Sequence, residues 1–167
     1  MRHYKFPNPE TKLCFSIGHP ISKQKTLFMH NAGFEYLGLN FLYLTCDIEP
    51  DRLRQGLLAL KRLNAAGISV TAPYKVNVLN YLDNFDHSVE KIGACNTILP
   101  DNGKLIGYNS DYIGAIECLK KKTEIKGKHV LVLGAGGVSR AIIYGLLEEK
   151  AKILVVNRTL KKAKVLQ

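Results

Sequence analysis

Short apolar runs alternate with longer segments of helical period through most of the chain. Continuous apolar runs favour buried strands, whereas apolar residues that recur every three or four positions favour amphipathic helices. We expect strands at residues 13–17, 41–46 and 68–71, and helices between them at residues 27–37 and 53–65. Because such alternation is typical of βαβ units, the first part of the chain is predicted to be an α/β domain with a mainly parallel sheet.

A hairpin is predicted further along the chain. Residues 96–99 and 104–108 are apolar runs that flank the sequence Asp-Asn-Gly at residues 101–103. Asn-Gly favours the positive φ values of a two-residue turn, so we expect the two runs to pair at the edge of the sheet. Before the hairpin, the pattern predicts helical stretches around residues 76–82 and 87–92.

A second βαβ unit follows a connecting helix that Ser110 or Asn109 is expected to cap. The chain is therefore divided into an α/β domain, a connecting helix and linker, and the start of a second α/β domain, at residues 1–108, 109–125 and 126–167. Within the last of these, the pattern predicts a strand, a glycine turn, a helix and a strand, at residues 129–133, 134–137, 138–149 and 153–156.

The glycine turn of the second unit is a candidate phosphate site. Glycines between a strand and a helix allow a tight turn and let backbone N–H groups approach a pyrophosphate at the positive end of the helix. Ser139 stands where the usual G-x-G-x-x-G pattern has its last glycine, and a glycine turn can also be purely steric. The candidate residues are Gly134, Ala135, Gly136, Gly137 and Val138.

The residues after the second strand of this unit favour NADP over NAD. A NAD site places a carboxylate there to bind the ribose hydroxyls, but this chain has Asn157, Arg158 and Thr159. An arginine pairs with a 2′-phosphate that a carboxylate would repel, and Lys162 adds a second positive charge. Alternatively, Asn157 and Thr159 cap the next helix, a role that is compatible with phosphate binding.

Composition narrows the function classes only in part. The 167 residues carry a net charge of +10, which attracts anionic small molecules and nucleic acids alike. No helix-turn-helix or zinc-ligand spacing accompanies the charge, so nucleic acid is not an expected partner. The four cysteines show no C-x-x-C pair and the sequence shows no leader or membrane-spanning run, so we expect free thiols, no metal site and a cytoplasmic location.

Five segments, in this order and spacing, resemble the shikimate dehydrogenase family over nearly the whole chain. The fifth segment joins the glycine turn to Asn157-Arg158-Thr159. The first four are Gly18-His19-Pro20-Ile21 with Phe28-Met29-His30-Asn31, Ser69-Val70-Thr71-Ala72-Pro73-Tyr74-Lys75, Ile92-Gly93-Ala94-Cys95-Asn96-Thr97, and Gly107-Tyr108-Asn109-Ser110-Asp111-Tyr112-Ile113-Gly114.

The resemblance implies a shikimate-binding domain at residues 1–108, followed by an incomplete Rossmann-type NADP-binding domain. The implied activity is the reversible, NADP-dependent reduction of 3-dehydroshikimate to shikimate, a step of aromatic amino acid synthesis. Lys75 and Asp111 occupy the positions of the family's catalytic pair. Thr71 and Asn96 occupy substrate-binding positions, where a hydroxyl and an amide suit a polyhydroxylated ring.

The first substrate loop departs from the family pattern. The family usually has two serines there for the substrate carboxylate, and this chain has Gln24 and Thr26. Thr26 keeps the hydroxyl, whereas the longer amide of Gln24 places its donor elsewhere. A preference for quinate therefore stays open, as does a non-catalytic module that binds shikimate or quinate.

The second domain contains two expected strands, whereas a doubly wound nucleotide domain has about six. We therefore expect little or no dehydrogenase activity from the chain on its own. The second strand would also present an unpaired edge, which favours self-association or a partner chain that completes the sheet.

Overall fold

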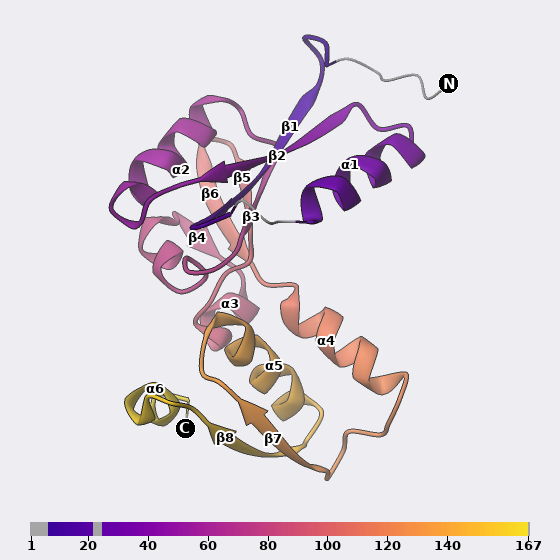
Figure 1. Cartoon of the computed structure of the whole chain (residues 1–167), viewed down its shortest axis with the longest axis vertical. Helices are drawn as coiled ribbons and strands as arrows, with labels where there is room; N and C mark the ends of the chain where they lie inside the picture. Colours follow the sequence, from indigo (N-terminus) through magenta and orange to yellow (C-terminus); the bar gives the residue numbers. More distant parts are fainter. Residues whose placement is uncertain (1–6, 22–24, 167) are drawn as a thin grey trace.

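The computed structural model describes residues 7–21 and 25–166, which form a six-stranded and a two-stranded sheet (Figure 1). The order in the larger sheet is β2-β1-β3-β5-β6-β4, with β1–β2, β1–β3 and β4–β6 parallel and β5 antiparallel to both neighbours. This confirms the predicted α/β class and mainly parallel sheet. The strands are β1 (Lys12–Gly18), β2 (Phe41–Asp47), β3 (Gly67–Val70), β4 (Asn84–Phe85), β5 (Thr97–Asp101) and β6 (Lys104–Tyr108).

Helices lie on both sides of the larger sheet (Figure 1). The main core lies on the α2 side, because alternate residues of β1 and β3 point there: Phe15 and Ile17 pack with Leu57, which belongs to α2 (Leu53–Arg62). A short 3₁₀ helix, η1 (Pro50–Arg52), leads into α2. On the other side, α1 (Thr26–Tyr36) stacks His30 on Tyr43 of β2, with 4.3 Å between ring centroids.

The hairpin is present, but it does not form the edge of the sheet. Asn102 and Gly103 have φ values of 46° and 74°, as a tight two-residue turn requires. The edge is instead the two-residue strand β4, which the sequence analysis missed because so short a run has no measurable periodicity. The stretch expected near residues 76–82 is the 3₁₀ helix η2 (Asn77–Tyr81), and α3 (His87–Ile92) follows β4.

The second unit is a parallel pair, β7 (His129–Leu133) and β8 (Lys152–Val156), joined by α5 (Gly137–Glu148). It follows α4 (Asp111–Lys120), and α6 (Leu160–Lys164) follows β8. A second core contains Ile116 of α4, which packs with Leu146 of α5. Leu131 and Leu154 are exposed on the smaller sheet. The expectation that self-association or a partner chain completes this sheet stays a prediction, as does the division of the chain at residues 108 and 125.

The strand directions bring several chain segments to one edge of the larger sheet. The carboxyl ends of β1, β2, β3 and β6 and the amino end of β5 meet there, because β5 runs opposite to its neighbours. Backbone hydrogen bonds hold the segments that continue beyond this edge: the Thr71 N–H donates to the Ile17 carbonyl, and the Val70 N–H donates to the Asn96 carbonyl. None of the helices in the described part of the chain is long and apolar enough to span a membrane.

Candidate active site

Lys75 and Asp111 form a close ion pair at this edge. Lys75 Nζ donates to Asp111 Oδ2 over 2.6 Å, and the two side chains are only 14% and 22% exposed. Lys75 lies in the segment after β3, whereas Asp111 begins α4 directly after β6. The sheet therefore brings together a cation and an anion that lie 36 positions apart in the chain.

Asn96 connects this pair to the start of α4. Its Nδ2 donates to Asp111 Oδ1 over 2.8 Å and to Ser110 Oγ over 3.0 Å, while its Oδ1 accepts from the Ser110 backbone N–H over 3.0 Å. The Thr97 hydroxyl also donates to Asn96 Oδ1. Both oxygens of Asp111 are thus held, one by an ammonium and one by an amide, which leaves the carboxylate in a single orientation.

Two further contacts position the pair. The Cys95 N–H donates to the Lys75 carbonyl over 2.7 Å, which ties the lysine segment to the residue before Asn96. Asn109 is buried; its Nδ2 donates to the Ala94 carbonyl, and its Oδ1 accepts from the Asp111 N–H over 3.0 Å. Of the two expected caps, Asn109 therefore makes the side-chain bond at the start of α4, and the Ser110 side chain does not.

The remaining expected substrate residues lie around the same edge. Thr71 directly follows β3, and its methyl group approaches Gly18 so closely that a Cβ atom on Gly18 would lie 2.5 Å away. Thr26 is the first residue of α1, which starts after the loop that leaves β1. Gln24 falls outside the described residues, so its expected role is untested.

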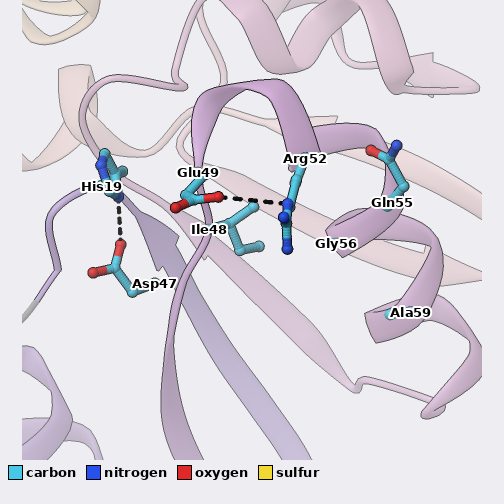
Figure 2. A pocket seen from close by; sticks show the side chains of 8 residues that line it. All are labelled: His19, Asp47, Ile48, Glu49, Arg52, Gln55, Gly56 and Ala59. Atoms are coloured by element: carbon cyan, nitrogen blue, oxygen red, sulfur yellow. Dashed lines mark hydrogen bonds and ion pairs between the residues drawn. The ribbon is translucent and has the colours of Figure 1, made fainter.

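Beside these residues, at the ends of β1 and β2, lies an open groove of about 620 Å³ that the sequence analysis did not identify (Figure 2). His19 Nδ1 and Asp47 Oδ1 lie 2.8 Å apart at one end of the groove, and the ion pair of Arg52 with Glu49 lies between them and Gln55 of α2. His19 is also joined to the segment before Lys75, because its N–H donates to the Ala72 carbonyl. The signal that could have revealed the groove is the convergence of strand ends, which requires the strand order.

The glycine turn is tight and leaves space on one side. Gly134 has a φ of +115°, which a side chain would strain, and its N–H donates to the Val156 carbonyl at the end of β8. A Cβ atom on Gly136, the N-cap of α5, would meet nothing within 4 Å. Open space therefore lies beside the N-cap of α5, at the helix end that attracts anions, so the turn has room for a phosphate group there. Ala135 is buried, and Val138 is 48% exposed.

The basic residues expected to select NADP follow β8, next to the glycine turn. Arg158 and Lys162 are exposed, and Lys162 lies on α6. The Asn157 amide donates to the Thr159 carbonyl over 2.8 Å, so it braces the loop and does not cap α6. Thr159 occupies the N-cap position of α6 without a side-chain bond. The loop thus presents the Arg158 guanidinium without any competing carboxylate of its own.

A buried thiol lies directly behind the site. Cys95 is completely buried, and its Sγ contacts the Thr97 carbonyl over 3.1 Å. Burial raises the pKa of Cys95 to about 11, and backbone hydrogen bonds from Tyr108 and Thr97 oppose this only in part. The thiol therefore stays protonated at neutral pH and packs in the core as a small apolar side chain.

This thiol predicts a loss of stability in alkali. An unfolded thiol loses its proton near its ordinary pKa of 9.0, whereas folded Cys95 keeps its proton until about pH 11. Because the unfolded state binds fewer protons in this window, stability is unaffected below pH 9 and falls between pH 9 and 11, by up to roughly 2 kcal/mol. Urea unfolding at pH 8 and pH 10.5 measures the loss.

The matched variants are Cys95→Ala and Cys118→Ala, since Cys118 is exposed. The change at Cys95 should reduce the alkaline loss, whereas the change at Cys118 should leave it as in the unaltered chain. An equal alkaline loss in both variants would contradict this assignment.

Comparison with known proteins gives consistent matches over most of the chain. Residues 16–98 match the family described as "Shikimate dehydrogenase substrate binding domain", and residues 117–167 match "Shikimate / quinate 5-dehydrogenase". The chain is 46% identical over 160 residues to a protein named shikimate dehydrogenase (NADP(+)) from Carboxydothermus hydrogenoformans, covering 95% of this chain and 57% of that protein. It thus spans little more than half the length of the curated relatives that it matches.

Solved structures agree with these matches. The crystal structure of shikimate dehydrogenase from Aquifex aeolicus has a TM-score of 0.92 and 42% identity, over 95% of this chain and 60% of that one. The structure of shikimate 5-dehydrogenase from Thermus thermophilus in complex with NADP(H) and shikimate has a TM-score of 0.86 and 35% identity, over 93% and 59%.

Proposed function

Because the chain belongs to the shikimate dehydrogenase family, we propose that it binds shikimate or 3-dehydroshikimate beside Lys75 and Asp111, and NADP at its glycine turn. The observation that carries the proposal is the Lys75–Asp111–Asn96 cluster, at an edge where strand ends converge. Its donors and acceptors suit a ligand with several hydroxyl groups.

The proposed reaction is the reversible reduction of the 3-keto group of 3-dehydroshikimate. NADPH, when bound, supplies the hydride to the carbonyl carbon. Lys75 Nζ donates a proton to the carbonyl oxygen as negative charge develops there, and in the reverse direction its neutral amine accepts the proton of the shikimate hydroxyl. The ketone thus gains one hydride and one proton, and the alcohol loses the same two.

Asp111 and Asn96 keep Lys75 ready for this transfer. Asp111 Oδ2 accepts one ammonium proton and so directs the Lys75 side chain, which has three donors in total. Asn96 holds the other oxygen of Asp111, so the carboxylate does not rotate when a ligand arrives. Thr71, at the end of the neighbouring strand, and Thr26, at the start of α1, are proposed to bind the ligand's polar groups, as is Gln24.

For the cofactor, we propose that the backbone of Gly134, Ala135, Gly136, Gly137 and Val138 holds the pyrophosphate. Asn157 and Thr159 shape the adjacent loop, and Arg158 and Lys162 bind the 2′-phosphate. The charge distribution supports this assignment. Residues 126–167 contain nine of the 24 lysines and arginines but only two of the 14 acidic residues, so the second unit attracts a polyanionic ligand. The four free cysteines suit a reducing compartment, and we propose the cytoplasm as the location.

Calorimetric titration of the chain with shikimate, quinate and NADP tests the proposal. We expect shikimate to bind at least as tightly as quinate, and NADP to bind with an affinity that falls as salt increases. Preference for quinate would move the assignment to a quinate dehydrogenase. Failure of both ring acids to bind would contradict the substrate assignment.

Arg158→Ala separates the two sites. We expect it to weaken NADP binding by about tenfold, since a charge-assisted contact to the 2′-phosphate is lost, and to leave shikimate binding unchanged. Lys164→Ala removes one positive charge from the adjacent helix and serves as the control, with a smaller effect on NADP. Equal effects of the two variants would mean that Arg158 contributes only general charge.

A further inference from the structure

One face of α5 consists of small residues that pack on the first part of the chain. Gly137, Ala141 and Gly145 are spaced four apart and therefore lie on the same face of the helix. Ala141 is completely buried in a cluster with Ile92 and Ala94. Ala94 lies immediately before Cys95 and Asn96 in the sequence. Because these side chains are small, α5 lies directly against the chain segments that build the candidate active site.

The first of these small residues approaches Lys75. A Cβ atom placed on Gly137 would lie 2.7 Å from Cβ of Lys75, and 3.3 Å and 3.5 Å from its Cδ and Cγ. Real Cβ atoms do not approach other carbons to 2.7 Å, so a side chain at residue 137 requires Lys75 or α5 to move. Gly136, one position earlier, meets nothing within 4 Å and has no such restriction.

Lys75 cannot turn away easily, because both of its ends are held. Its carbonyl accepts from the Cys95 N–H over 2.7 Å, and its Nζ donates to Asp111 over 2.6 Å. A side chain at residue 137 would crowd Cβ of Lys75, which lies between these two held ends. It therefore displaces the ammonium relative to Asp111, or pushes α5 away from the first part of the chain.

From this contact we infer that Gly137 is a positioning residue for Lys75: besides its place in the cofactor turn, the glycine is required at this position by the lysine side chain. The inference rests on the proposed function for its meaning in catalysis, since that is where Lys75 acts as proton donor. In that reaction, the turn that holds the cofactor touches the proton donor, because Gly137 contacts Lys75. A shift of the turn would therefore also shift Lys75.

The test compares Gly137→Ala with Gly145→Ala. The second variant adds the same methyl group on the same face of the same helix. Its Cβ would lie 2.5 Å from Cγ1 of Ile116 and 3.4 Å from Cβ of Tyr112, and Lys75 is not among its nearest neighbours. In the chain labelled with ¹³C at the lysine ε-carbon, the Lys75 resonance is assigned by its loss in Lys75→Arg. We expect Gly137→Ala to shift or broaden this resonance and Gly145→Ala to leave it in place. Equal effects, or no effect of Gly137→Ala, would overturn the inference.

Two measurements keep the test decisive if Gly137→Ala does not fold or the proposed function is wrong. In the unaltered chain, a nuclear Overhauser effect is expected between the Gly137 α-protons and the Lys75 β-protons, and its absence would overturn the contact. Shikimate affinity should fall about tenfold in Gly137→Ala, as a disturbed hydrogen bond to a charged group implies, and less than twofold in Gly145→Ala. If the unaltered chain does not bind shikimate, the proposed function fails, while the resonance and the proton contact still decide the role of Gly137.

Discussion

Lys75→Met is expected to lower the free energy of unfolding by about 2 kcal/mol at pH 7, because it leaves the Asp111 carboxylate without its cation. Removal of one partner from a fully buried pair costs about 3–5 kcal/mol, and partial exposure of these side chains, 14% and 22%, reduces the cost. Methionine keeps the apolar length of the lysine, so lost packing contributes little. Urea unfolding measures the stability, and titration should show shikimate binding weakened by tenfold or more.

Lys120→Met provides the matched control. Lys120 pairs with Glu149 over 2.9 Å, a distance close to that of Lys75 and Asp111, but the side chains are 47% and 32% exposed. Solvent screens such a pair, so its loss should cost no more than about 1 kcal/mol. If the two lysine variants lose the same stability, the Lys75–Asp111 pair stabilises the fold no more than an exposed ion pair does.

A double-mutant cycle with Asp111→Asn separates the ion pair from other effects of each change. The asparagine Oδ1 can still accept from Asn96 Nδ2, so this variant mainly removes the negative charge and strands the Lys75 ammonium. When Lys75→Met and Asp111→Asn are combined, no charge is left without a partner. The double variant should therefore be more stable than the sum of the single losses predicts, with a coupling of about 1–3 kcal/mol. Additive losses would show that the two charges do not interact.

The sequence predicted much of this site because strand direction determines at which edge of the sheet each segment ends. Lys75 follows a strand of the parallel part of the sheet, and Asp111 follows the last strand of the hairpin, so both lie at one edge once β5 is antiparallel. The contact between them follows from the order of strands and the family resemblance together. Their catalytic roles stay predictions, and so does the role of Gln24.

The contacts that could not be predicted depend on register or on packing between distant segments. The bridge from Asn96 to Ser110 and Asp111 requires the pairing of β5 with β6 to place those residues side by side, and periodicity does not specify that register. The approach of Gly137 to Lys75 depends on how α5 packs on the first part of the chain. Its place in a cofactor turn already explains a glycine at residue 137, so the sequence pattern does not point to a second role beside Lys75.

Asn96→Asp tests the other side of the cluster and should be more harmful than its small change in shape suggests. The aspartate keeps the oxygen that accepts from the Ser110 N–H, but it replaces the amide donor by an oxygen that faces Asp111 Oδ1 at 2.8 Å. Two carboxylates at this distance do not both ionise readily, even with Lys75 nearby, so the pair retains a proton and its apparent pKa is raised in the folded state. We expect a loss of stability of about 2 kcal/mol at pH 8 and shikimate binding at least tenfold weaker.

The pH dependence distinguishes this repulsion from a merely lost hydrogen bond. A raised pKa means that the folded variant binds more protons than the unfolded one, so the stability deficit of Asn96→Asp relative to the unaltered chain should shrink as pH falls from 8 to 5. Asn96→Ala removes the same donor without adding charge, and its deficit should stay nearly constant over that range. Asn84→Asp, at an exposed asparagine, should change stability by no more than about 0.5 kcal/mol. A deficit in Asn96→Asp that does not depend on pH would mean that Asp111 lies farther from residue 96 in solution than 2.8 Å, and the cluster would then not orient Lys75 as proposed.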